Sequence, residues 1–142
     1  MKRALEPRAD RDLFVVPLTI APADIDENGH VNNVVYVRWL QDVGTAHWNA
    51  RFDEATRRRW SWVALRHEID YLRALQPGAR PVARTWVGDP AGARFPRYVR
   101  IEDEQGRLCA QGVTEWCLVD SATLRPARIP ADMLAPLARQ RP

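Results

Sequence analysis

The chain has 142 residues, which favours one domain with a substantial hydrophobic core. Hydrophobic residues are 46% and charged residues 27% of the total, so the composition excludes a disordered chain, and no apolar stretch is long enough to span a membrane. The net charge of +3 is carried by arginine, since Lys2 is the one lysine. Arginine suits phosphate groups, but the basic runs fall in different expected elements. We therefore expect a solvated basic surface and no nucleic-acid partner.

Residues 1–12 are charged, contain Pro7 and lack the apolar core of a signal peptide, so we expect a loose lead-in. Cys109 and Cys117 fall on one expected strand, roughly 26 Å apart at the usual rise per residue, which is too far for a disulfide. These observations favour a soluble cytoplasmic protein with reduced thiols.

The first half of the chain predicts a strand and one long helix. Residues 14–20 are rich in β-branched and aromatic side chains and indicate a strand, and a polar loop follows Pro22. A helix is expected from Asn32 or Asn33, either of which could cap it, to residues 50–53. One face of this helix is predicted to be buried and consists of Tyr36, Trp39, Leu40, Val43 and His47. Gly44 within the helix suggests close packing against a sheet, and we expect the charged residues 53–59 to be a connector.

The second half predicts four strands joined by tight turns. Residues 63–74 alternate, with Leu65, His67, Ile69 and Tyr71 on one face, and the next strands are expected over 81–88, 93–102 and 108–120. The tail, residues 123–142, contains four prolines and a weak helical run over 132–139. Consecutive hairpins make an antiparallel sheet, and its inner face is the large apolar partner available to the helix. The order predicts an α+β fold in which a curved antiparallel sheet wraps one central helix.

The loop before the helix concentrates the polar chemistry of the chain. It reads Asp24-Ile25-Asp26-Glu27-Asn28-Gly29-His30-Val31-Asn32-Asn33. An ionised carboxylate can take a proton from water or attack a carbonyl carbon, and unpaired N–H groups at a helix start can hold an oxyanion. The alternative for Asp26 is an acid that caps or shapes the turn, and His30 could equally bond a loop carbonyl.

This loop, in its strand–loop–helix context, resembles the hotdog-fold thioesterases, and most closely the branch of 4-hydroxybenzoyl-CoA and plant-type acyl-carrier-protein thioesterases. The resemblance covers roughly residues 14–120. It implies that Asp26 is the catalytic carboxylate, that Asn28 and His30 are tied to it, and that a backbone N–H near Asn33 polarises the thioester carbonyl. The acid that the plant-type branch carries after the helix aligns with Ala74, so that role is vacant unless Glu68 or Asp70 fills it.

The resemblance also implies a substrate site and partners. Gly29, Val31 and Tyr36 are expected to contact substrate, although Gly29 most simply supplies a positive φ and a residue such as Tyr36 is more often part of the core. The arginines of the third hairpin strand could grip coenzyme A phosphates, or could be solvated edge charges; they are Arg94, Arg97 and Arg100, with Arg97 on the opposite face from the other two. No metal or organic cofactor is expected beyond the coenzyme A of the substrate. Open sheet edges predict a homodimer with sites between subunits, and a tetramer is the alternative assembly.

Three functions compete on this fold. An acyl-CoA or acyl-carrier-protein thioesterase fits the motif best. Hotdog hydratases and dehydratases are the alternative, but they place the histidine five residues after the acid with a proline between, whereas His30 follows Asp26 by four residues without one. A non-catalytic acyl-binding module on the same fold is the third possibility, because a fold does not fix a function.

Overall fold

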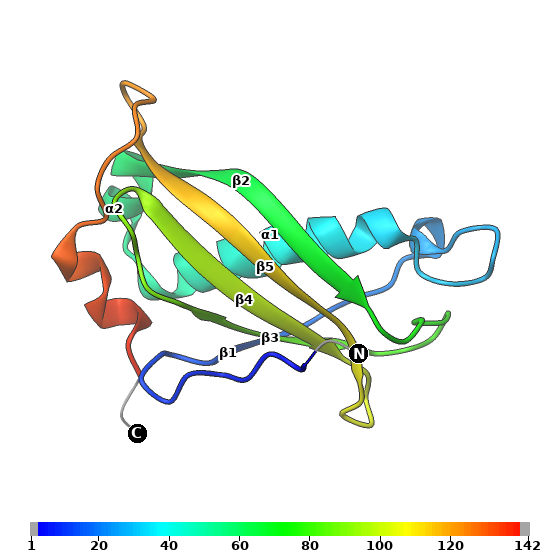
Figure 1. Cartoon of the computed structure of the whole chain (residues 1–142). Helices are drawn as coiled ribbons and strands as arrows, with labels where there is room; N and C mark the ends of the chain where they lie inside the picture. Colours follow the sequence, from blue (N-terminus) through cyan, green and yellow to red (C-terminus); the bar gives the residue numbers. More distant parts are fainter. Residues whose placement is uncertain (1–2, 140–142) are drawn as a thin grey trace.

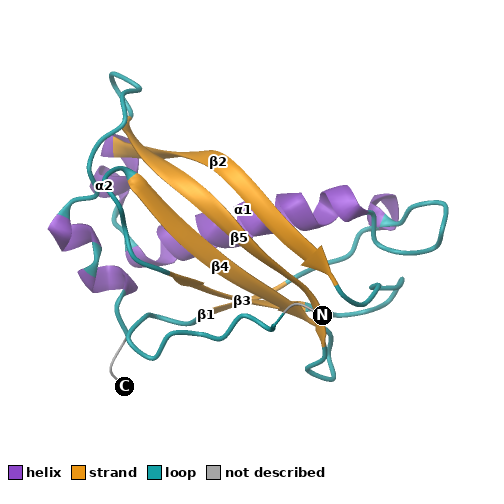
Figure 2. Ribbon diagram, in the orientation of Figure 1, coloured by secondary structure: helices purple, strands orange, loops and turns teal. Residues whose placement is uncertain are grey.

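The computed structural model describes residues 3–139 and consists of a five-stranded antiparallel sheet with one long helix against it. The strands lie in the order β1-β3-β4-β5-β2, and α1 runs along one face of the sheet (Figure 1, Figure 2). Their bounds are β1 Phe14–Pro17, α1 Asn33–Arg51, β2 Trp60–Tyr71, β3 Val82–Val87, β4 Arg94–Glu102 and β5 Leu108–Asp120. The predicted α+β arrangement of a central helix against a hairpin-built sheet is confirmed.

The start and the buried face of α1 follow the prediction. Asn32 is the N-cap residue, and its side-chain oxygen accepts a hydrogen bond of 3.0 Å from the Val34 backbone N–H. All five residues of the expected apolar face are at most 3% exposed; they are Tyr36, Trp39, Leu40, Val43 and His47. These side chains share one face of the helix because an α-helix has 3.6 residues per turn, and this apolar face packs α1 against the sheet.

The prediction of a connector over residues 53–59 is wrong, because residues Glu54–Arg59 form a short helix, α2. Asp53 caps it by accepting a 2.8 Å hydrogen bond from the Thr56 N–H, and Glu54 and the arginines 57–59 complement its positive and negative ends. The capping residue was readable in the sequence, but the segment is too short to show a helical period.

Strand β2 starts three residues earlier than predicted and contains a β-bulge. Ala64 pairs with Trp116 and Arg66 pairs with Glu115, so Leu65 has no partner opposite it. A bulge shifts the alternation by one residue. Leu65 is consequently 47% exposed, rather than sharing the inner face with His67 and Ile69 as predicted.

Two other boundaries differ because of proline. Strand β1 ends at Pro17, three residues before the predicted end, and a single further bond joins Leu18 N–H to the Pro81 carbonyl. The helical run expected over 132–139 is two 3₁₀ turns, η2 Ala131–Met133 and η3 Ala135–Leu137, since Pro136 has no N–H for a longer helix. Residues 1–2 and 140–142 of the expected lead-in and tail lie outside the described residues.

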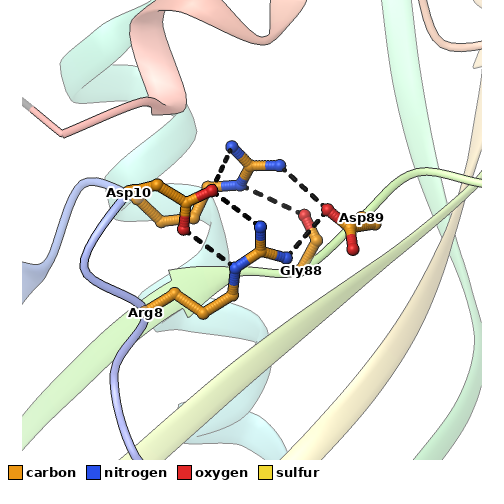
Figure 3. A network of polar contacts seen from close by, with 5 residues as sticks. Arg8, Asp10, Gly88 and Asp89 are labelled. Atoms are coloured by element: carbon orange, nitrogen blue, oxygen red, sulfur yellow. Dashed lines mark hydrogen bonds and ion pairs between the residues drawn. The ribbon is translucent and has the colours of Figure 1, made fainter.

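The lead-in, expected to be loose, makes several contacts with the sheet and its loops. Leu5 N–H donates to the Gln111 side chain at 2.8 Å, and Arg8 bridges Asp10 and Asp89 at 2.7 and 2.8 Å, as Figure 3 shows. The pairs around Arg8 are exposed and are worth little individually. Their effect is to hold the chain just before Asp12, two residues after Asp10, enters the core.

The core has two apolar clusters, one at each end of α1. The cluster at the helix start is built around Tyr36, Trp39 and Leu40, and the other around Phe52, Phe95 and Leu118. A chain of buried polar groups lies among them: Asp12 Oδ2 contacts His47 Nε2 at 2.7 Å, and Arg97 Nη1 contacts His47 Nδ1 at 2.9 Å and Thr85 Oγ1 at 3.0 Å.

This chain fixes the protonation of His47. Arginine can only donate, so His47 Nδ1 accepts and its proton resides on Nε2, from which it is donated to Asp12. Complete burial and the neighbouring Arg97 charge lower the pKa of His47 to about 4. Burial opposes ionisation of Asp12, but hydrogen bonds from Arg51 and His47 outweigh it and lower the pKa of that carboxyl.

The His47 environment predicts that stability falls as the solution is acidified from pH 6.5 to 4. The unfolded chain binds a proton at this histidine below pH 6.5, whereas the folded chain does not until about pH 4. The linked loss of unfolding free energy is roughly 3 kcal/mol. Ionised Asp12 also contributes to the unfolding free energy, because its pKa is lowered in the folded chain. This contribution is lost only below the ordinary carboxyl pKa of 3.8, outside the range from pH 6.5 to 4.

Urea unfolding of the wild type and of His47→Gln over this pH range measures the effect. His67, whose pKa burial also lowers, contributes in both proteins, so the difference between their slopes isolates His47. Equal slopes for the two proteins would contradict the assignment of a buried neutral imidazole.

Candidate active site

The polar loop before α1 is a tight reversal closed by backbone hydrogen bonds. Ile25 and Val31 form an antiparallel bridge, Asp26 N–H donates to the His30 carbonyl at 2.9 Å, and Gly29 N–H donates to the Asp26 carbonyl at 3.0 Å. Gly29 has φ +77°, so the expectation of a positive φ there is confirmed. The reversal presents the residues from Glu27 to His30 to solvent and leaves Asp26 half-buried.

The carboxylate of Asp26 is anchored by one oxygen. Oδ1 accepts from Asn28 N–H at 2.9 Å and, more weakly, from His30 N–H at 3.4 Å. Among residues 3–139, Oδ2 has no hydrogen-bond partner. The expected ties of Asn28 and His30 to this acid are therefore made by their backbone amides, while both side chains are exposed.

The start of α1 supplies an unused donor close by in the chain. The Asn32 cap satisfies the Val34 N–H, whereas the N–H of Asn33, the first helical residue, has no acceptor within the described part of the chain. The carbonyl of Asn33 accepts a 3.1 Å hydrogen bond from the Tyr71 hydroxyl at the end of β2. This contact places the helix start beside the carboxyl end of the edge strand β2.

The neighbouring acid, Asp24, has a structural role. Its carboxylate is 5% exposed and receives two hydrogen bonds from Arg38, at 3.1 and 3.2 Å, and one from Ala21 N–H at 2.9 Å. The Arg38 guanidinium lowers the pKa of Asp24. The carbonyl of Asp24 also accepts from Asn32 N–H, so this residue braces the loop against the helix.

Two residues predicted to contact substrate lie in the core beneath this loop. Val31 and Tyr36 are each 3% exposed, and the Tyr36 ring packs edge-on against Trp39 and Tyr71. Burial raises the pKa of Tyr36 to about 12. These side chains therefore pack beneath the helix start.

The three arginines predicted on β4 do not come together. Arg97 is 7% exposed on the helix-facing side, whereas Arg94 pairs with Glu115 at 3.2 Å on the other face. Arg100, also on that face, is held by Glu102 at 3.1 Å and by the Leu5 carbonyl at 2.8 Å. The expected separation of Arg97 from the other two is confirmed.

The acids considered as substitutes at the position after the helix are engaged elsewhere. Glu68 receives a 2.7 Å hydrogen bond from Arg66, and Asp70 receives one of 3.1 Å from Gln111 Nε2. Ala74 is exposed just beyond β2.

A cavity of about 300 Å³ lies toward the other end of α1, and the sequence reasoning missed it. Counting 1.5 Å per residue along the helix, Trp48 in its wall is roughly 22 Å from Asn33. Four of the six tryptophans line the cavity; they are Trp48, Trp60, Trp62 and Trp116. The close spacing of three of these in the sequence was the available signal. Asp26 is not part of this wall, so the motif and the cavity are separate in this chain.

Comparison with known proteins identifies the family. The model of the thioesterase-like superfamily matches residues 20–137, which is most of the chain. No curated protein sequence matches significantly. Solved structures share the fold at low sequence identity. One is a DHNA-CoA thioesterase from Staphylococcus aureus, at 18% identity and TM-score 0.76, covering 87% of each chain.

Two further structures agree with this one. A predicted thioesterase from Bacillus stearothermophilus is 23% identical, with TM-score 0.76 over 92% of this chain and 98% of that one. A thioesterase from Thermus thermophilus, complexed with coenzyme A and zinc, is 21% identical, with TM-score 0.75 over 87% of this chain and 90% of that one.

Two observations on the described residues bear on partners. Within residues 3–139, no helix is both long and apolar enough to cross a membrane. In the same range, no three His, Cys, Asp or Glu side chains cluster closely enough to hold a metal ion. With the family match and the sheet order described above, the chain belongs to the thioesterase-like superfamily and is a hotdog-fold thioester hydrolase.

Proposed function

We propose that the chain hydrolyses acyl thioesters of coenzyme A or of an acyl-carrier protein, with Asp26 as general base or nucleophile. The observation that carries the proposal is the state of this carboxylate. One oxygen is fixed by backbone N–H groups, and the other has no partner among the described residues, in a loop that leads directly into a helix start. The Thermus thermophilus relative that holds coenzyme A supports a thioester of this carrier.

The reaction needs three functions from these residues. Asp26 takes a proton from water as the water oxygen bonds to the thioester carbon, or attacks that carbon itself. The Asn33 N–H and the positive end of α1 stabilise the negative charge that develops on the carbonyl oxygen. The C–S bond then breaks without a strong general acid, because a thiol of pKa near 8.5 is a good leaving group, and the thiolate takes up a proton in solution. Where Asp26 has attacked the carbon itself, water then hydrolyses the mixed anhydride on its carboxylate, which releases the acid and restores Asp26. This scheme requires no metal or organic cofactor.

The remaining loop residues position the Asp26 carboxylate and form the solvent-exposed surface around it. Asn28 and His30 hold the Asp26 carboxylate through their amides, and their exposed side chains face the solvent from which substrate arrives. Gly29 permits the reversal. The free thiols of Cys109 and Cys117 are consistent with a cytoplasmic location.

A homodimer formed along β2 would complete the site. This edge strand has twelve residues, and its exposed apolar side chains include Val63 and Leu65, at 48% and 47%. The helix start lies beside the carboxyl end of β2, through Tyr71, and the cavity lies at its amino end, through Trp60. Antiparallel pairing of two β2 strands brings Asp26 of one protomer to the cavity of the other. Pairing of two such dimers would give a tetramer.

Replacement of Asp26 by asparagine is expected to lower kcat on acyl-CoA by at least about a hundredfold, since general-base catalysis contributes this much. Asparagine keeps the Oδ1 acceptor for the two amides, so the loop and the fold are retained. Thiol release from an acyl-CoA panel, with circular dichroism as the fold check, measures the effect. Glu27→Gln, the neighbouring exposed acid, is the matched control. Full activity of the asparagine variant would remove Asp26 from the mechanism.

The double substitution Val63→Glu and Leu65→Glu is expected to convert a dimer into monomers and to abolish turnover with it. Four carboxylates would then face one another across the paired strands, and each cavity would lose its Asp26. Sedimentation velocity and thiol release on the same samples test both effects. A monomeric wild type with full activity would contradict a site shared between subunits.

A further inference from the structure

The cavity at the far end of α1 has aromatic walls. Its volume of about 300 Å³ is at the lower end of the range for small-molecule sites. Trp48 and Trp62 meet edge to face with ring centroids 5.6 Å apart, and Trp62 lies 6.3 Å from Phe95. Flat, rigid walls of this kind suit one or two fused rings better than a long flexible chain.

A buried positive charge faces this space. Arg97 lines the cavity and is 7% exposed, and its Nη1 donates to the neutral His47 and to Thr85. Within residues 3–139 no acceptor is bonded to its Nε or Nη2. The nearest carboxylate along the network, Asp12, is on the far side of the His47 ring. Burial lowers the pKa of Arg97 to about 10, which leaves it charged at neutral pH.

A second donor at the same place is also unused. Trp116 Nε1 is the one buried side-chain nitrogen or oxygen of residues 3–139 that has no hydrogen-bond partner. Trp116 stands diagonally across the β4–β5 ladder from Arg97, because Thr114 is the residue paired with Arg97. A Cβ built on Gly44 would lie 3.3 Å from Arg97 Nε and 3.7 Å from Trp116. Glycine at 44 therefore keeps the space between these two groups open.

The charges that line the cavity all have the same sign. Arg57 is the other ionisable residue of the wall, bonded to the Phe52 carbonyl and to the Asn49 amide oxygen, and the described lining contains no aspartate or glutamate. Buried charges and donors are retained in proteins when something pairs with them. The Arg97 guanidinium and the Trp116 Nε1–H are therefore suited to bind an anionic oxygen, and the aromatic walls are suited to a flat ring that carries it.

We propose that this cavity is the acyl pocket for an aromatic acyl thioester that carries a carboxylate on the ring, opposite the thioester. The carboxylate binds Arg97 and Trp116 Nε1–H, the ring lies among the tryptophans, and the thioester points to the mouth. This assignment rests on the proposed function, because the Asp26 that attacks the thioester comes from the second protomer. Hydrolysis consumes one water and releases an aromatic dicarboxylic acid and the free thiol.

Binding of free acids tests the cavity without catalysis. Benzoate is expected to quench tryptophan fluorescence of the wild-type protein and to bind about tenfold more tightly than benzamide or hexanoate. Trp116→Phe removes the unpartnered donor while keeping a smaller aromatic ring at this position, and we expect it to weaken benzoate binding by about tenfold. Arg97→Gln abolishes the preference for benzoate over benzamide. Trp86→Phe, a buried tryptophan outside the cavity that stacks on Tyr98, is the control for the optical signal.

Kinetics on matched thioesters test the substrate class. The expected kcat/KM for 4-carboxybenzoyl-CoA exceeds that for 4-carbamoylbenzoyl-CoA, its uncharged isostere, by about tenfold, and Trp116→Phe reduces this ratio. Equal affinity for benzoate and benzamide, unaltered by Trp116→Phe, overturns the proposal even if other acyl-CoAs are hydrolysed. Selective benzoate binding without hydrolysis of any thioester supports the cavity assignment and contradicts the proposed function.

Discussion

The buried chain from Asp12 through His47 to Arg97 is the interaction on which the rest of the structure depends. It joins the lead-in, the long helix and the middle of the sheet at one imidazole ring that is fully buried. Only one tautomer satisfies both neighbours, so the ring fixes how α1 sits on β4. A group with two obligatory partners in a low-dielectric interior specifies a packing arrangement in a way that interchangeable apolar contacts do not.

The same chain determines the character of the cavity beside it. His47 is held neutral, so it satisfies one nitrogen of Arg97 without cancelling its charge. The helix approaches Arg97 and Trp116 at Gly44, where no side chain fills the space. The packing of α1 on the sheet and the character of the cavity therefore have the same origin. His47 holds the helix to the sheet and, because it is neutral, leaves the charge of Arg97 facing the tryptophan-lined cavity.

The motif and the cavity also differ in what holds them. The reversal around Asp26 is made of local bonds between residues close in sequence, such as Asp26 Oδ1 with Asn28 N–H. The cavity is assembled from seven elements spread from residue 44 to residue 137; they are α1, α2, β2, β3, β4, β5 and η3. In the proposed dimer, antiparallel pairing of two β2 strands would bring the motif of one chain to the cavity of the other, because antiparallel strands bring opposite ends together.

The sequence by itself determined the features that repeat or act locally: the apolar stripe from Tyr36 to His47, the hairpins of the sheet, the positive φ at Gly29 and the family motif around Asp26. Tertiary structure decided the bulge at Leu65, the partners of Arg97 and the gathering of four tryptophans. Period and capping depend on neighbours a few residues away, which a sequence displays directly. Which side chains meet across a core depends on strand register and helix placement, and these are set by the packing of the whole chain.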